Sequence, residues 1–228
     1  MKTKKSSLLA LGVLALTISI TACSSSGNNG QTPGEESAAN RTSNTAASAD
    51  SKAQSAYEKQ YRTSVFLGDS ITEGLSYHDV LREGNVLAGA GKTAEFAQKD
   101  VGDLVGRQPE HVYIQLGSDD ILWPADNPQQ YSLTHYAQLI HAIQSELPKA
   151  RITLLSVTPV TAEAKKAEPR YQNIGKYNEG LKELASQEHV EYVDLTSLVN
   201  GHSDLYDTDG IHFQAAFYPI LLDYLKDR

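Results

Sequence analysis

The sequence has little of several residue types that often define a protein's class. It holds one cysteine, one methionine and one tryptophan in 228 residues. A single cysteine excludes an internal disulfide, so the fold cannot depend on covalent cross-links. A net charge of −8, without clusters of lysine and arginine, argues against a nucleic-acid-binding surface. The same charge gives no electrostatic attraction to anionic lipid headgroups.

The N-terminus has the parts of a secretory signal. Met1–Lys5 is basic, Leu8–Ile20 is mostly apolar, and small residues precede Cys23. The apolar run is shorter than the roughly 20 residues that a membrane-spanning helix needs. Residues 20–23, ITAC, resemble the bacterial lipobox, in which the chain is cut before the cysteine and the sulfur is lipidated. We therefore expect residues 1–22 to be a lipoprotein signal peptide; an ordinary signal peptide with a chance cysteine is the alternative.

Residues 23–56 are expected to be a disordered tether. They are rich in Ser, Asn, Ala and Thr and, after the cysteine, contain no aromatic or large aliphatic residue. A flexible chain of this length reaches on the order of 30 Å. Acyl chains on Cys23 would then hold the domain formed by residues 57–228 at the extracytoplasmic face of the cell membrane. Removal of the leader with its three lysines would lower the net charge from −8 to −11.

Short apolar runs alternate with longer mixed stretches throughout the predicted domain. The predicted strands are Val65–Leu67, Asn85–Ala88, His111–Leu116, Arg151–Val157 and Val190–Leu195. The predicted helices are Leu75–Arg82, Thr93–Val105, Pro128–Leu147, Arg170–Gln187 and Gln214–Lys226. This alternation indicates an α/β protein with a parallel sheet covered on both faces by helices. Functional sites in such sheets form beyond the carboxyl ends of the strands.

Two short segments at opposite ends of this domain carry candidate catalytic residues. Residues 64–74, SVFLGDSITEG, place Ser70 directly after a buried strand, and Asp209 and His212 stand three residues apart in DGIH. A serine hydroxyl becomes nucleophilic when a histidine takes its proton, and a carboxylate orients that histidine. Taken singly, GDS could be a tight turn and DGIH a helix N-cap. Their combination in one α/β domain favours a serine nucleophile with its base.

The two segments resemble conserved blocks of a known family. FLGDSITEG is similar to the first block of the SGNH hydrolases, the GDSL-type esterases and lipases, and DGIH is similar to their last block. The resemblance covers residues 64–228 and implies a flavodoxin-like three-layer α/β/α sandwich with about five parallel strands. By this similarity Ser70 is the nucleophile, His212 the base and Asp209 the residue that orients the base.

The resemblance also implies an oxyanion hole. The backbone N–H of Ser70 would be one donor to the oxyanion. The second donor in the family is a glycine, for which Gly91 in VLAGAGKTAEF is the preferred match and Gly89 the alternative.

The third oxyanion donor of the family is an asparagine, and here the sequence departs from the pattern. Residues 117–120 read GSDD, so Asp119 stands where the asparagine amide would donate. An ionised carboxylate has no proton to donate and repels the oxyanion. Burial and the neighbouring Asp120 could keep Asp119 protonated, as an apolar site does for an aspartic acid donor in some other enzymes. Otherwise the hole relies on two N–H groups, or the site is weak or inactive.

The predicted function is that of a membrane-anchored serine esterase. A tethered domain outside the membrane meets wall polymers, so short acyl esters, such as acetyl esters of carbohydrates or cell-wall polymers, are the expected substrates. Transfer of the acyl group to a sugar hydroxyl, or a catalytically weak surface-binding lipoprotein, remain alternatives. No cofactor and no metal are expected, because His135 and His141 are six residues apart on a helix, which is not a ligand spacing. Trp123 either walls the pocket or packs in the core.

Overall fold

The computed structural model describes residues 54–228. The predicted signal peptide, Cys23 and all but the end of the predicted tether lie outside the described residues. Residues 54–60 are helical, so the last three residues assigned to the tether belong to a helix. No helix among residues 54–228 combines the length and the apolar character that crossing a bilayer requires.

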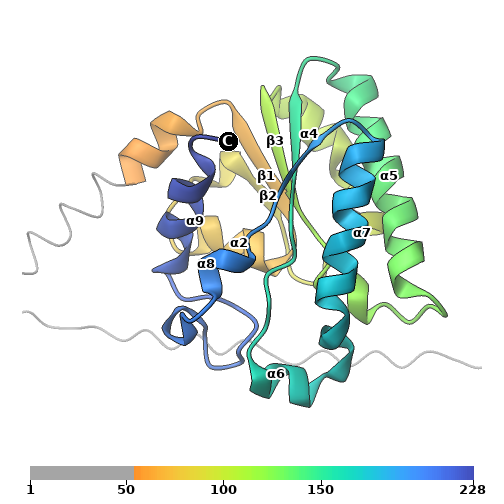
Figure 1. The fold of residues 1–228 in the computed structure, drawn as a ribbon. Helices are drawn as coiled ribbons and strands as arrows, with labels where there is room; N and C mark the ends of the chain where they lie inside the picture. Colours follow the sequence, from red (N-terminus) through yellow and green to blue (C-terminus); the bar gives the residue numbers. More distant parts are fainter. Residues whose placement is uncertain (1–53) are drawn as a thin grey trace, which may run out of the picture.

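Five parallel strands form one sheet at the centre of the described residues (Figure 1). The strands are β1 (Ser64–Gly68), β2 (Val86–Ala88), β3 (His111–Gln115), β4 (Arg151–Leu155) and β5 (Glu191–Val193). Their order in the sheet is β2-β1-β3-β4-β5. Leu67 of β1 lies opposite Leu87 of β2 and Ile114 of β3, the two strands beside it. The predicted parallel sheet of about five strands is confirmed, and its order is the flavodoxin-like one.

Alternate residues of each strand enter two separate apolar clusters, one on each face of the sheet. In β1, Val65 and Leu67 join the first cluster and Phe66 joins the second. Helices α4 (Val101–Arg107), α5 (Pro128–Glu146) and α7 (Ile174–Gln187) cover the first face, and α2 (Ser70–Tyr77), α8 (Thr196–Val199) and α9 (Phe217–Leu225) cover the second (Figure 1). Because both faces of the strands are buried, the strand sequences are nearly continuous apolar runs. The predicted three-layer α/β/α fold is therefore confirmed.

The helices differ from the prediction at several places. The α-helices within residues 64–228 are α2 (Ser70–Tyr77), α3 (Ala94–Ala97), α4 (Val101–Arg107), α5 (Pro128–Glu146), α6 (Ala162–Ala167), α7 (Ile174–Gln187), α8 (Thr196–Val199) and α9 (Phe217–Leu225). The single helix predicted at Thr93–Val105 is wrong, because the 3₁₀ turn η2 (Gln98–Asp100) separates α3 from α4. The helix predicted at Leu75–Arg82 begins five residues earlier. The short helices α6 and α8 were not predicted.

Further 3₁₀ turns connect these elements. They are η1 (Glu83–Asn85), η3 (Asp120–Leu122), η4 (Pro169–Asn173) and η5 (Ser203–Leu205). The turn η4 occupies the first residues of the helix predicted at Arg170–Gln187, so regular α-helix begins only at Ile174.

The chain reverses its direction of travel across the sheet between β1 and β3. From β1 the chain moves outward to β2 at one edge, then returns to β3 and continues to β5 at the other edge. The carboxyl ends of β1 and β3 are the topological switch point, where open α/β sheets form their ligand sites. Ser70 follows β1 and Asp119 follows β3, so the fold brings these two predicted site residues to that point.

Candidate active site

Ser70 is the first residue of α2, directly beyond the carboxyl end of β1. Asp69 caps this helix, because its Oδ1 accepts a hydrogen bond from the backbone N–H of Ile71 at 3.0 Å. An N-cap aspartate satisfies one of the N–H groups that a helix start leaves unpaired. The tight strand-to-helix junction therefore holds the Ser70 hydroxyl at the end of the sheet.

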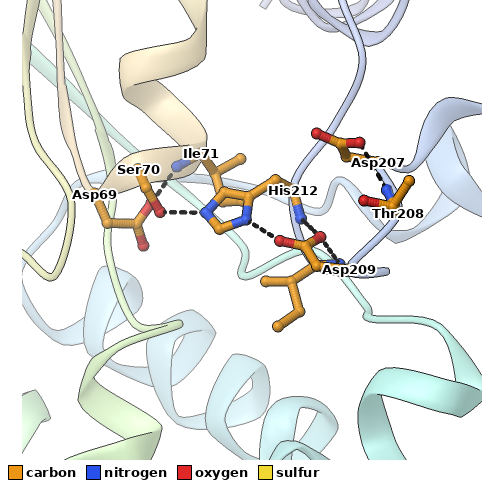
Figure 2. Close-up of polar contacts among 8 residues, drawn as sticks. Asp69, Ser70, Ile71, Asp207, Thr208, Asp209 and His212 are labelled. Carbon is orange, nitrogen blue, oxygen red and sulfur yellow. Dashed lines mark hydrogen bonds and ion pairs between the residues drawn. The ribbon is translucent and has the colours of Figure 1, made fainter.

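The structure brings the three predicted catalytic residues together in one hydrogen-bond chain (Figure 2). The Oγ of Ser70 lies 2.9 Å from Nε2 of His212. The other ring nitrogen of His212, Nδ1, lies 2.5 Å from Oδ2 of Asp209. The side chains of His212 and Asp209 are 43% and 45% exposed, so this chain faces solvent and can be reached by a large substrate.

The loop before α9 fixes the Asp209 carboxylate. Its Oδ1 accepts hydrogen bonds from the backbone N–H groups of Ile211 at 2.8 Å and His212 at 2.9 Å. The backbone carbonyl of His212 in turn accepts from the N–H of Asp207. Partial burial opposes ionisation of Asp209, but the hydrogen bonds from the His212 ring and from these two N–H groups outweigh it, so its pKa is below the usual value. Asp209 is thus charged at neutral pH and fixes the orientation of the imidazole.

The backbone hydrogen bonds distinguish the two glycines considered for the oxyanion hole. The N–H of Gly89 donates to the carbonyl of Gly68 at 3.3 Å and is therefore occupied. Among the hydrogen bonds of residues 54–228, none uses the N–H of Gly91 or of Ser70. Gly91 has a φ of +72°, a left-handed conformation that glycine adopts without strain. The geometry favours Gly91 over Gly89 as an oxyanion donor.

Asp119 lies at the site with one oxygen that has no partner. Its Oδ2 is the buried side-chain polar atom that lacks a hydrogen bond within the described part of the chain. Burial raises the pKa of Asp119, and only the positive form of His212 opposes this shift. His212 is therefore close enough for its charge to act on the carboxyl. A neutral Asp119 carries an O–H that can donate; an ionised Asp119 cannot.

Two further carboxyl groups lie beside Asp119 beneath the site. Asp69 is fully buried and accepts a short hydrogen bond from the hydroxyl of Ser118. Burial raises the pKa of Asp69 to about 7; the Ser118 hydroxyl opposes that shift, and the Asp119 carboxylate adds to it. Asp120 accepts hydrogen bonds from the Ser132 hydroxyl at 2.6 Å and from the N–H of Ala94. Asp120 therefore ties the segment after β3 to the start of α3.

Sequence reasoning missed one buried residue near the site. Tyr171 of η4 is 6% exposed, and its pKa is raised by burial and then by Asp119, Glu168, Asp69 and Asp209. Tyr171 therefore lies close enough to the carboxyl groups of the site for their charge to act on its hydroxyl. No sequence signal could have identified Tyr171, because it lies far along the chain from every motif.

Other residues weighed from the sequence lie outside the site. Asp194 accepts a hydrogen bond from the N–H of Thr196 at the start of α8. His141 pairs with Glu188 on the surface, and His135 bonds within α5 to the carbonyl of Tyr131. Within residues 54–228, no group of His, Cys, Asp and Glu side chains is arranged to hold a metal ion.

A doubly covered parallel sheet with a serine, a histidine and an aspartate linked at its switch point defines an α/β protein of the hydrolase type. Comparison with family models gives the particular family. Residues 66–220 match the GDSL-like lipase/acylhydrolase family, and the chain belongs to that family. The SGNH/GDSL resemblance found in the sequence motifs is confirmed. No curated protein sequence matches this chain at a significant level.

Solved structures share the fold at low sequence identity. A GDSL-like lipase from Bacteroides thetaiotaomicron is 19% identical with a TM-score of 0.58, over 72% of this chain and 85% of that chain. A lipase/acylhydrolase from Enterococcus faecalis is 18% identical with a TM-score of 0.58, over 72% of this chain and 92% of that chain. An acetyl-xylooligosaccharide esterase from Geobacillus, as a mutant, is 19% identical with a TM-score of 0.50, over 70% and 90%.

Proposed function

We propose that this protein is a serine ester hydrolase with Ser70 as its nucleophile. The observation that carries the proposal is the hydrogen-bond chain from Ser70 through His212 to Asp209, with distances of 2.9 and 2.5 Å. Nε2 of His212 takes the hydroxyl proton while Oγ bonds to the ester carbonyl carbon. The C–O bond to the alcohol then breaks, and the alcohol leaves with that proton. Water, deprotonated by His212, then attacks the acyl carbon. The bond from that carbon to Oγ breaks, the proton on His212 returns to Oγ, and the acid is released.

The backbone N–H groups of Ser70 and Gly91 are the donors proposed for the oxyanion. Both are uncommitted among the described residues, and they follow the carboxyl ends of the neighbouring parallel strands β1 and β2. Asp119 would act as a third donor while its carboxyl is protonated, which its burial favours. Once ionised, the same carboxyl would lose its donor and repel the oxyanion. Loss of one donor costs about 10²–10³ in rate.

The substitution Asp119→Asn tests this assignment through its pH dependence. Asparagine donates from its amide at every pH, whereas the aspartic acid donates only below its raised pKa. The ratio of kcat of Asp119→Asn to kcat of the parent should therefore lie within about tenfold of one at acidic pH. It should rise toward about 10² as the pH increases. A ratio that does not change with pH would contradict the assignment of Asp119 as an oxyanion donor.

We propose short acyl esters of carbohydrates as the substrate class. The open position of His212 and Asp209, each more than two-fifths exposed, suits a bulky alcohol part better than a long acyl chain, which needs an enclosed apolar tunnel. The Geobacillus enzyme that shares the fold is named for an acetylated xylo-oligosaccharide. Hydrolysis of a chromogenic acetate ester by the parent but not by Ser70→Ala would support the esterase; equal rates for both would refute it for this class.

We also propose that lipid on Cys23 anchors the enzyme at the extracytoplasmic face of the membrane. The support is the sequence alone: the only cysteine of the chain stands where the lipobox requires it. Each buried CH₂ group of an acyl chain adds about 0.8 kcal/mol of membrane affinity. The variant Cys23→Ser should appear in the soluble fraction, and its retention by membranes would contradict the anchor.

A second candidate function is a catalytically weak surface-binding protein. The partnerless buried Oδ2 of Asp119 favours it, because an ionised carboxylate there would oppose the negative charge of the reaction. This candidate predicts that the parent hydrolyses esters no faster than Ser70→Ala at any pH. The esterase proposal predicts a difference of about 10³ or more at the pH where the parent is most active.

A further inference from the structure

Three exposed or half-buried aromatic rings lie side by side near the carboxyl edge of the sheet. We call them the aromatic row: Phe96 of α3, Trp123 after η3 and Tyr131 of α5. The edge of one ring of the Phe96–Trp123 pair meets the face of the other, with centroids 5.4 Å apart. Trp123 lies nearly parallel to Tyr131 at 6.4 Å. Phe96 is 38% exposed, and the other two rings are partly accessible.

The hydrophobic core does not account for this row. None of its three rings belongs to either apolar cluster of the fold. Helix α3 packs inward through Ala94 and Ala97, which are fully buried, and so leaves Phe96 on the outside. Exposed aromatic side chains that are gathered in one place mark binding surfaces more often than scattered ones do.

Neighbouring polar groups hold the rings in place. The Tyr131 hydroxyl donates to Oε2 of Glu95 at 2.9 Å. The ammonium of Lys99 lies 5.0 Å from the centre of the Phe96 ring. The amide of Gln98 donates to Oε1 of Gln138 at 3.2 Å. The row thus presents apolar faces bordered by hydrogen-bonding groups, and its geometry is preorganised.

The row is attached to the two segments that carry Gly91 and Asp119, the residues proposed as oxyanion donors beside Ser70. Helix α3 begins three residues after Gly91, and Trp123 stands four residues after Asp119. Along a 3₁₀ turn, four residues span about 8 Å. Asp120 joins the two segments. It accepts a hydrogen bond from the N–H of Ala94, and it is the first residue of η3, the turn that ends just before Trp123. A substrate with its ester at Ser70 can therefore reach the row with a neighbouring ring.

We propose that the aromatic row is a subsite for a sugar ring of the ester substrate. A pyranose has an apolar C–H face that packs on an aromatic ring and hydroxyl groups around its rim. That combination matches rings bordered by Glu95 and Lys99. A fatty acyl chain fits poorly, because charged groups stand beside the open rings. The proposal rests on the proposed esterase function and adds the place where the carbohydrate part binds.

A fluorescence titration tests binding without any turnover. Trp123 is the only tryptophan of the chain, so its emission reports on the row directly. The Ser70→Ala protein would be titrated with acetylated xylo-oligosaccharide and with chito-oligosaccharide. We expect a saturable change in emission with at least one of them, and a Kd about five- to tenfold higher when Phe96→Ala is added. No change with either sugar, or a Kd that Phe96→Ala leaves unaltered, overturns the subsite.

Kinetics provide a second and independent test. Phe96→Ala should raise KM for acetylated xylo-oligosaccharide about five- to tenfold and leave kcat within about twofold of the parent value. The rate of 4-nitrophenyl acetate hydrolysis should also stay within about twofold of the parent rate. Tyr77→Ala is the matched control, because Tyr77 is an exposed aromatic, 79% accessible, on α2 outside the row. An equal loss of kcat/KM by Phe96→Ala on both substrates would overturn the subsite. If no variant and no parent hydrolyses any ester, the esterase proposal fails, and the titration still decides the subsite.

Discussion

The buried carboxyl of Asp69 offers a quantitative test of the electrostatics beneath the site. The substitution Asp69→Asn removes its charge and keeps its shape. Asparagine is as good an N-cap as aspartate, so the hydrogen bond from the N–H of Ile71 can be retained. The Ser118 hydroxyl, which now donates to Asp69, can accept from the new amide instead. The main change is therefore the loss of an ionisable group at a position that is buried from solvent.

The size of the effect follows from the raised pKa of Asp69. Burial raises this pKa from 3.8 to about 7, a shift of about 3 units. Each unit corresponds to about 1.36 kcal/mol, so ionising Asp69 in the folded state costs at most about 4 kcal/mol. For a group whose folded pKa is raised, the stabilisation is fully present below about pH 4 and is lost as the pH rises to about 7. The asparagine variant has no such loss.

Urea unfolding of parent and variant between about pH 4 and pH 8 measures this difference. The free energy of unfolding of Asp69→Asn minus that of the parent should increase with pH by up to about 4 kcal/mol and level off above about pH 7. Groups that titrate in both proteins cancel from the difference. Asp103→Asn, at an exposed position of α4, is the control for removing a carboxylate charge at the surface. A pH-independent difference for Asp69→Asn would refute the buried, neutral carboxyl.

Two further substitutions test the site and its support. Asp209→Asn should lower kcat on an acetate ester by about 10⁴ at neutral pH, because a neutral amide no longer holds the His212 imidazole in the tautomer that accepts the Ser70 proton. The circular dichroism spectrum should be unchanged. A loss of kcat below about tenfold would contradict the role of Asp209 in orienting His212. Gly117→Ala should destabilise the fold by roughly 3 kcal/mol or more in urea unfolding. The reason is that Gly117 has a φ of +132° and that a Cβ there would lie 2.4 Å from the ring of Tyr177. An unchanged midpoint of urea unfolding would contradict this packing.

Much of the fold could be predicted because burial on both faces of a strand leaves a clear sequence pattern. Such a strand needs apolar residues at successive positions, so Val65–Leu67 and the middle of β4 were recognisable. The start of α2 was missed because Ser70 and Gly74 are weak helix formers. The Asp69 cap and the packing of Leu75 against the second cluster outweigh that weakness. Such tertiary contacts are not visible in local propensity.

The candidate site was predictable where motif residues carry it, and not elsewhere. Ser70, His212 and Asp209 come from two short motifs, and the structure brings them within hydrogen-bonding distance. The sequence motif already favoured Gly91 over Gly89, and the sheet adds a physical reason, because the N–H of Gly89 donates to the carbonyl of Gly68 on the neighbouring strand. Tyr171 comes near the carboxyl groups of the site only because η4 packs against η3 in the folded chain. Residues of this kind follow from topology and not from spacing along the chain.

Covalent trapping tests the central claim, that Ser70 is the nucleophile, most directly. The protein would be incubated with a fluorophosphonate ester, which reacts with activated serines, and then analysed by intact mass and peptide mapping. The account predicts one adduct per chain, on Ser70, formed at a rate that falls by about 10³ or more in His212→Ala. An adduct on another residue, or ester hydrolysis that persists after Ser70 is fully modified, would contradict it.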